Sequence, residues 1–309
     1  PTGQRTLIVL VMRKLLASSS FAIAGALQTM ANRLKARVAK SEATWLGDLA
    51  TDYEAFEETA EELDDDEEEE PLTPEQVVAV KKEIDELESF VTLASSIQTN
   101  AKGQALVDAL GAAFKKADEL GAAHKAVIFT ESRKTQDYLL RVLAGTPWGD
   151  GVVLFNGTNT DSQSNAIYEK WLKRHKGTDL ITGSKSADMR ATLVEEFRER
   201  GKILIATEAG AEGINLQFCS LVINYDLPWN PQRIEQRIGR CHRYGQKHDV
   251  VVVNFLNSTN AADQRVYRLL SDKFQLFEGV FGASDEILGA IESGVDFDRR
   301  ITEIYQECR

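Results

Sequence analysis

Cysteine is scarce in this sequence, and long apolar segments are missing from it. The 309 residues include only three cysteines, and these stand in no paired spacing: Cys219, Cys241 and Cys308. Such cysteines indicate a reducing, cytoplasmic setting rather than a secreted fold held by disulfide bonds. The apolar stretch at residues 7–16 is broken by Arg13 and Lys14 and is too short to cross a bilayer. We therefore expect neither a signal peptide nor a membrane partner.

The sequence also lacks a phosphate-binding loop of the form GxxxxGK[ST], which holds the nucleotide in many hydrolases. It opens on Pro1 rather than on methionine. We therefore expect the chain to be an excised piece of a longer protein. With 43% hydrophobic residues, it can still build one large domain or two small ones.

Basic residues are missing between Glu57 and Glu70, where eleven of the 48 acidic residues stand. This run accounts for nearly all of the formal net charge of -12, so the rest of the chain carries about -1. The acidic composition is therefore no argument against nucleic-acid binding. Seven consecutive acids at residues 64–70 are typical of a disordered linker, and a partner-binding or DNA-mimicking role is the alternative.

Lysine is absent from residues 203–246, where arginine takes its place. A helix is predicted from Pro231, capped by Asn230. Along it, Arg233, Arg237 and Arg240 are spaced four and three apart, which predicts one shared face with Gln236 beside it; Arg243 follows the helix. Guanidinium groups suit phosphate oxygens, so this face predicts a polyanion site. A solvated basic helix face is the alternative.

From residue 125 onward, short apolar runs alternate with helical segments, which predicts an α/β fold with a parallel sheet flanked by helices. The strands are expected at residues 126–129, 152–155, 203–206, 221–224 and 250–255, and the helices at 135–143, 187–200, 231–240 and 261–277. Ligands bind such sheets at the carboxyl ends of the strands. Thr130, Gly157, Thr207 and Asp226 are expected to cluster there.

Three domains follow from these patterns. Residues 1–100 are expected to form a helical appendage, with one helix over 1–40, another over 41–63, a linker at 57–70 and a helix from Pro74 to about Ser96. Residues 101–259 are expected to form the α/β lobe, entered by a helix over 101–120. Residues 260–309 are expected to form C-terminal bracing helices.

Several residues outside the arginine helix allow two interpretations. The segment at 158–187 holds Tyr168 and Trp171 among basic residues, which favours either nucleic-acid contact or an ordinary packing helix with a basic end. Trp229 is either a stacking platform or a packing residue. Cys241, His242 and His248 match no zinc spacing, so no metal site is predicted.

Three segments resemble motifs of superfamily 2 helicases of the Swi/Snf-type branch. The sequence ATEAGAEGINLQ at 206–217 resembles the fifth motif, QRIGRCHRYGQ at 236–246 resembles the sixth, and YDLPWNPQRIEQ at 225–236 joins them as in this branch. The sequence FTES at 129–132 resembles the fourth motif. The resemblance includes bacterial members that associate with RNA polymerase, and it implies a RecA-like C-terminal motor lobe.

The resemblance implies the following roles at the nucleotide. Arg240 and Arg243 would be the arginine fingers that reach the γ-phosphate, as the catalytic residues of this lobe. Gln236 and Arg237 would bond to phosphate or to the first lobe. Glu212, Gly213 and Asn215 would complete the ATP-binding set, although Asn215 stands where many relatives have aspartate. ATP and Mg²⁺ would be held mainly by the first lobe, which carries the Walker motifs.

The resemblance also implies contacts to the backbone of double-stranded DNA. The residues that would make them are Thr130, Ser132, Arg133, Gly157 and Thr207. The other implied partners are the N-terminal RecA-like lobe of the same protein and RNA polymerase or a defence or repair factor. The function implied is an ATP-dependent DNA translocase or helicase, inactive without its first lobe. The alternative is a non-catalytic interaction module, and arginines buried in internal ion pairs would count against the motor interpretation.

Overall fold

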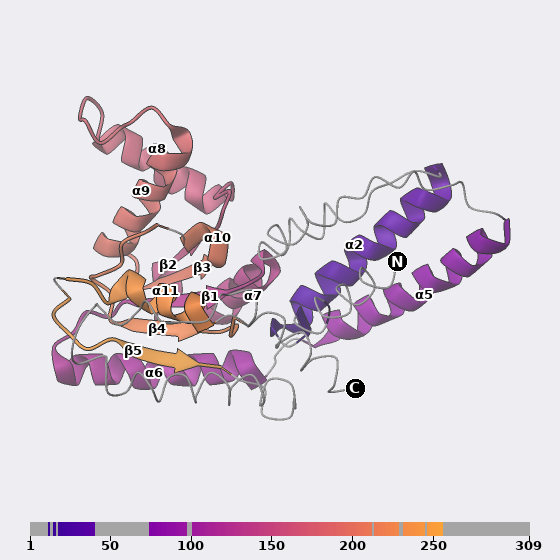
Figure 1. Ribbon diagram of the computed structural model, residues 1–309, viewed down its shortest axis with the longest axis horizontal. Coiled ribbons are helices and arrows are strands. Elements are labelled where there is room, and N and C mark those ends of the chain that lie inside the picture. The colour runs from indigo at the N-terminus through magenta and orange to yellow at the C-terminus, as the bar shows by residue number, and fades with distance from the viewer. Residues whose placement is uncertain are drawn as a thin grey trace.

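The computed structural model describes residues 12, 15–16, 18–40, 74–97, 101–211, 213–228, 231–244 and 246–255 (Figure 1). The predictions for the helix at 41–63, the acidic run at 57–70 and the bracing helices at 260–309 lie outside these residues, as do Glu212 and Trp229. Within the described ranges, no helix combines the length and apolarity that crossing a membrane requires.

A five-stranded parallel sheet forms the centre of the lobe. Its strands are β1 (Ala126–Thr130), β2 (Val152–Phe155), β3 (Ile203–Thr207), β4 (Leu221–Asn224) and β5 (Val251–Asn254). They lie in the order β2-β3-β1-β4-β5, and every neighbouring pair is parallel. All residues of the first four strands are buried, which explains their continuous apolar sequences. The predicted parallel sheet is confirmed.

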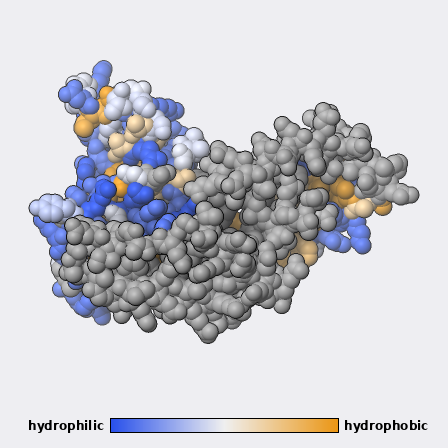
Figure 2. Space-filling view, viewed as in Figure 1, coloured by the Kyte–Doolittle hydropathy of each residue, from blue (hydrophilic) through white to orange (hydrophobic). Residues whose placement is uncertain are grey.

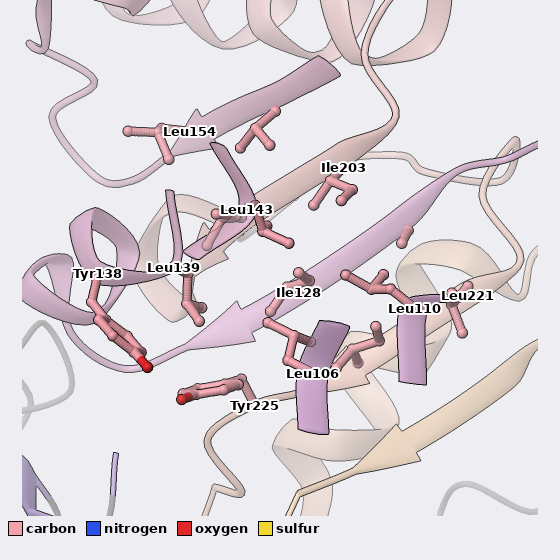
Figure 3. Close-up of a cluster of buried hydrophobic side chains, with 14 of the residues drawn as sticks. Leu106, Leu110, Ile128, Tyr138, Leu139, Leu143, Leu154, Ile203, Leu221 and Tyr225 are labelled. Atoms are coloured by element: carbon pink, nitrogen blue, oxygen red, sulfur yellow. The ribbon is translucent and has the colours of Figure 1, made fainter. Parts of the chain in front are cut away.

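Helices cover both faces of this sheet. On one face, α6 (Ala101–Leu120) and α7 (Arg133–Ala144) pack against alternate strand residues such as Ile128 and Ile205. Figure 3 shows this cluster, with Leu106 and Leu139 pointing toward Ile128. On the other face lie α9 (Lys185–Glu199), α10 (Glu208–Ala211) and α11 (Pro231–Cys241). The three-layer arrangement is that of a RecA-like lobe.

An arm of two helices extends from the lobe (Figure 1). It consists of α2 (Ser20–Lys40) and α5 (Pro74–Ser96), which lie side by side and are joined by an ion pair between Lys35 Nζ and Glu88 Oε1 at 2.5 Å. The root of the arm packs on α7, where the rings of Phe21 and Tyr138 stack with centroids 5.1 Å apart. The arm is therefore attached to the lobe through the start of α2.

The predicted single helix over residues 1–40 needs a correction. Helical structure is interrupted at Ser19, and α2 begins at Ser20. The Ser19 hydroxyl accepts a hydrogen bond from the Ala22 main-chain N–H at 3.0 Å, which caps the new helix. The serines at 18–20 therefore mark the start of α2, which the apolar periodicity alone did not reveal.

The segment at 158–187 contains α8 (Ser162–Arg174), which leads to α9 through residues 175–184. Asp161 caps α8 by accepting from the Ser164 N–H at 2.8 Å. Trp171 is only 3% exposed, and its indole N–H donates to Glu195 on α9 at 2.9 Å. The packing interpretation of this segment is therefore supported, since Trp171 has no face open for a nucleobase.

Candidate functional site

The carboxyl ends of β1, β3 and β4 bring polar residues together, as expected for an open parallel sheet. Thr130 and Thr207 end β1 and β3 as register partners. Asp226 follows β4, and its Oδ2 accepts a hydrogen bond from Thr130 Oγ1 at 2.5 Å. The predicted clustering of Thr130 and Asp226 is thus confirmed at this edge.

Arg237 of α11 lies inside the lobe rather than on its surface. It is 1% exposed, and its Nε and Nη2 donate to Glu208 Oε2 at 2.8 and 2.5 Å. Nη1 donates to Asn224 Oδ1 and to the Asp226 main-chain oxygen, both at 2.9 Å. The guanidinium also lies over the Phe129 ring, 4.9 Å from its centroid.

The expectation that Arg237 contacts the nucleotide or another lobe stays a prediction, while in this lobe its side chain is buried. All three guanidinium nitrogens donate to neighbouring elements of the same lobe. Of the four arginines considered from the sequence, this one meets the condition of burial in an internal ion pair. Arg237 therefore anchors α11 to the end of β4 and to α10.

The other polar residues of α11 take different positions. Gln236 and Arg243 are exposed, whereas Arg233 and Arg240 are half-buried. Figure 2 shows mainly hydrophilic side chains on the described part of the lobe around α10. Gln236 on α11 and Arg243 on the turn after it are thus exposed to solvent, while Arg237 is fixed inside.

The turn after α11, which carries Arg243, is held by Gln246. The Gln246 side-chain Nε2 donates to the main-chain oxygens of Cys219 and Cys241 at 3.0 and 3.2 Å. Its main-chain N–H donates to the Arg243 oxygen at 2.9 Å. Contact with the Cys219 thiol, together with burial, raises the pKa of the Cys241 thiol well above its ordinary value. The Cys241 thiol is therefore a neutral packing group beneath the turn.

The segment expected to face the nucleotide lies between β3 and β4. Gly213 has a φ of 75° and is exposed, so a side chain here would strain the backbone. Asn215 is exposed, and its Oδ1 accepts from the Gln217 N–H at 3.2 Å. Gly210 packs against the loop after β2, where an added Cβ would lie 2.6 Å from the Asn156 Cα.

The residues expected to touch nucleic acid divide into two groups. Thr130, Ser132 and Thr207 are buried, and the Ser132 hydroxyl accepts from the Lys134 N–H as the cap of α7. The Thr130 hydroxyl donates to Asp226 and the Ser132 hydroxyl caps α7, and contact of these three residues with a phosphate backbone stays a prediction. Gly157 is exposed and Arg133 is half-buried, with Arg133 Nη1 donating to Thr158 Oγ1 at 3.2 Å. These last two remain candidates.

Asp226 is ionised within this edge. Burial alone would raise the pKa of its carboxyl group, but the ammonium of Lys102 and the hydroxyl groups of Thr130 and Ser18 together lower the pKa below its ordinary value of 3.8. Its carboxylate is therefore charged at neutral pH and balanced by Lys102 Nζ at 3.0 Å. Within the ranges that the structure describes, no group of three His, Cys, Asp or Glu residues is placed to hold a metal ion.

Glu208, Asn224 and Gln246 have structural roles that sequence reasoning missed. A signal for them exists in α11, where Ile234, Ile238 and Cys241 are buried at helical spacing. Arg237 falls within that apolar stripe, so an arginine there needs an internal acceptor. Glu208 lies in the motif at 206–217, and the strand-end position of Asn224 also fits such an acceptor.

Comparison with known proteins places this geometry in context. Residues 137–245 match the helicase conserved C-terminal domain. The uncharacterised ATP-dependent helicase YqhH of Bacillus subtilis (strain 168) is 40% identical over 157 residues, which cover 50% of this chain and 27% of that protein. The RNA polymerase-associated protein RapA of Serratia proteamaculans (strain 568) is 40% identical over 89 residues, covering 28% of this chain and 9% of RapA.

Among solved structures, the C-terminal part of the Fun30 ATPase domain aligns with a TM-score of 0.39 and 22% identity, covering 65% of this chain and 53% of that one. The chain spans about a quarter of the length of YqhH and less than a tenth of the length of RapA. The similarity to both proteins thus concerns one part of a larger molecule.

Proposed function

We propose that this chain, which contains the C-terminal domain of a superfamily 2 helicase with Swi/Snf-type relatives, is the second motor lobe of an ATP-dependent DNA translocase or helicase. The observation that carries the proposal is the position of Arg243. It is exposed on a turn that Gln246 fixes, directly after a helix that Arg237 anchors. An arginine held this way is suited to a ligand that approaches from outside the lobe.

In this proposal Arg240 and Arg243 supply positive charge to the phosphoryl group during transfer. An arginine finger contributes about 10³ to 10⁵ in rate because it stabilises charge on the transferred phosphate. Gln236, exposed on the preceding turn of α11, would donate a hydrogen bond to the same phosphate or to the first lobe. Gly213 and Asn215, also exposed, would line the nucleotide side, together with Glu212.

The chain's own residues fit one half of a nucleotide site. They offer guanidinium groups for phosphate oxygens, whereas the cradle for the phosphates and Mg²⁺ would come from a lobe with the Walker motifs. ATP would supply the free energy for movement when both halves close on it. This lobe by itself is then expected to hydrolyse ATP negligibly.

Double-stranded DNA is the proposed track, contacted through its phosphates at Arg133 and Gly157. Arg133 extends from the start of α7 to Thr158, beside the exposed Gly157. Phosphate contacts carry no sequence information, which suits a motor that moves over any sequence. Binding should weaken as salt rises, because cations are released from the DNA when phosphates are neutralised.

The test is DNA-stimulated ATP hydrolysis by a protein that holds this lobe together with its Walker-motif lobe. Arg243→Ala should lower kcat by about 10³-fold or more while the melting temperature stays unchanged. Arg243→Lys should recover little, because an ammonium lacks the planar fork. Arg198→Ala, an exposed arginine of α9, is the matched control. Unchanged turnover in Arg243→Ala would remove the finger assignment.

A non-catalytic interaction module remains the alternative, and the arm is the observation in its favour. Phe90 and Leu93 on α5 are 55% and 64% exposed, and Figure 2 shows hydrophobic side chains on the arm. Replacing both residues by serine separates the two functions. Loss of partner capture with normal hydrolysis would assign the arm to binding, and RNA polymerase is the first partner to try because RapA is named for it.

A further inference from the structure

The buried side chain of Asp226 accepts four hydrogen bonds. It is 5% exposed, and its Oδ2 accepts from Ser18 Oγ at 2.7 Å, from Thr130 Oγ1 at 2.5 Å and from the Glu131 N–H at 3.1 Å. Its Oδ1 accepts from Lys102 Nζ at 3.0 Å. Both carboxylate oxygens are thus occupied by donors of the same chain.

These donors come from three separate parts of the fold. Ser18 lies at the root of the arm, Lys102 lies in the first turn of α6, and Thr130 ends β1. The ammonium of Lys102 also lies over the ring of Tyr225, 4.2 Å from its centroid. A single carboxylate therefore joins the arm, one helix of the lobe and the central strand.

Further hydroxyl groups strengthen the attachment of the arm. Ser18 Oγ lies 2.7 Å from Thr135 Oγ1 on α7, and Ser19 Oγ lies 3.2 Å from the same atom. All of these groups are buried. Hydrogen bonds in a buried setting have restricted geometry because each group left unpaired costs about 1–3 kcal/mol. The root of the arm is therefore held in one position relative to β1.

The main chain of Asp226 faces the other way, toward the arginine helix. Its carbonyl oxygen accepts from Arg237 Nη1 at 2.9 Å, and the same nitrogen donates to Asn224 at the end of β4. Arg237 is the residue that fixes α11. Asp226 thus connects the arm through its side chain and the arginine helix through its backbone.

Stable packing at position 226 does not require a carboxylate. A buried ion pair gains little over apolar residues of the same shape, because the charges must be desolvated. What a carboxylate adds is a set of directed acceptors, which only one arrangement of its four donors satisfies. Such a group specifies relative position more than it adds stability.

We propose that Asp226 is a positioning residue that couples the arm to the arginine helix, so that the orientation of α11 depends on how residues 18–19 are seated. The proposal rests on the proposed function only in that α11 faces the nucleotide. A partner or first lobe that shifts the arm would then change the placement of Arg240 and Arg243 without touching them.

Hydrogen exchange followed by mass spectrometry tests the coupling in this chain directly. In Asp226→Asn, an amide –NH₂ group replaces one carboxylate oxygen. In either orientation this –NH₂ faces hydrogen-bond donors, either Lys102 Nζ or the three donors that now bond to Oδ2. We expect faster exchange at residues 18–30 and 231–241 together, with α9 unchanged. Thr135→Val removes only the hydroxyl contacts that Ser18 and Ser19 make with α7. Because it loosens the seating of residues 18–19, it should also speed exchange at both 18–30 and 231–241, by less than Asp226→Asn.

Two further variants separate coupling from general loss of structure. Lys102→Met in combination with Asp226→Asn removes the opposing ammonium, and it should restore part of the protection at both sites. Asp137→Asn, an exposed carboxylate on α7, is the matched control. Exchange that is unchanged at 231–241, or that rises equally throughout the lobe, would overturn the proposal.

A readout in the two-lobe protein completes the test. Asp226→Asn should lower kcat by about 10- to 100-fold with little change in the KM for ATP, because a displacement of about 1 Å at a catalytic group costs on the order of 10²-fold. Unchanged kcat in an otherwise active protein would count against coupling. If that protein hydrolyses no ATP while the paired exchange persists, the proposed function fails and the coupling stands.

Discussion

Replacing Arg237 by leucine is expected to lower the free energy of unfolding by about 3–5 kcal/mol, the range for removing one partner of a buried ion pair. The change leaves three acceptors without their donor: the Glu208 carboxylate, Asn224 Oδ1 and the Asp226 main-chain oxygen. Leucine keeps much of the apolar volume against Phe129, so a cavity contributes little. The loss comes from the unpaired polar groups.

Urea unfolding monitored by circular dichroism measures this difference. Against a total stability of about 5–15 kcal/mol, the loss is large. In a lobe of this size it corresponds to a melting temperature lower by about 6–20 °C. The stability of Arg237→Lys should lie between that of the unchanged protein and that of Arg237→Leu, since one ammonium cannot reach all three acceptors. Glu208→Leu added to Arg237→Leu should recover part of the loss, because the unpaired carboxylate is then gone.

The control is Arg198→Leu, an exposed arginine of α9, which should change stability by no more than about 0.5 kcal/mol. A loss below about 1 kcal/mol for Arg237→Leu would refute the reasoning, since this is the scale of an ordinary surface substitution. The guanidinium would then be free to face a nucleotide, as the helical spacing of the arginines first indicated.

Two other substitutions test the lobe's design. Gly210→Ala should cost about 1–3 kcal/mol by urea unfolding, since overpacking would place its Cβ 2.6 Å from the Asn156 Cα. Gly239→Ala, whose Cβ would meet nothing within 4 Å, is its control, and equal effects would contradict the clash. Because the pKa of Asp226 lies below its ordinary value of 3.8, the stability from its charged form is present above that value and is lost as pH falls through the lowered pKa. Asp226→Asn should therefore flatten the loss of stability below about pH 5; equal slopes in both proteins would disprove this assignment.

Much of the fold follows from local sequence. Four strands were predictable because each is a continuous apolar run between polar turns, and β1 and β3 are one residue longer because Thr130 and Thr207 extend the pairing. The helices at 74–96 and 101–120 were predictable from their apolar periodicity and, for the first, from Pro74. Helix α7 begins at Arg133, two residues before the predicted start at 135, because Ser132 caps it.

The site was less predictable, because side-chain direction depends on distant partners. Spacing placed Arg233, Arg237 and Arg240 on one face, yet Arg237 turns inward to Glu208 and Asn224, which precede it by 29 and 13 positions. Sequence predicted that Thr130 lies near Asp226, but it did not show that the Thr130 hydroxyl is buried and donates to Asp226, 96 positions away. Burial of a polar residue is decided by an acceptor that local patterns do not reveal.

The central position of β1 has a consequence for synthesis of the protein. Its neighbours in the sheet are β3 and β4, which begin at Ile203 and Leu221. The ribosome adds about 5–20 residues per second. Several seconds therefore pass between the synthesis of β1 and that of β3, the first strand that can pair with it. During that interval its apolar segment AVIFT is exposed to other chains, and truncated products that stop short of Ile203 are expected to aggregate.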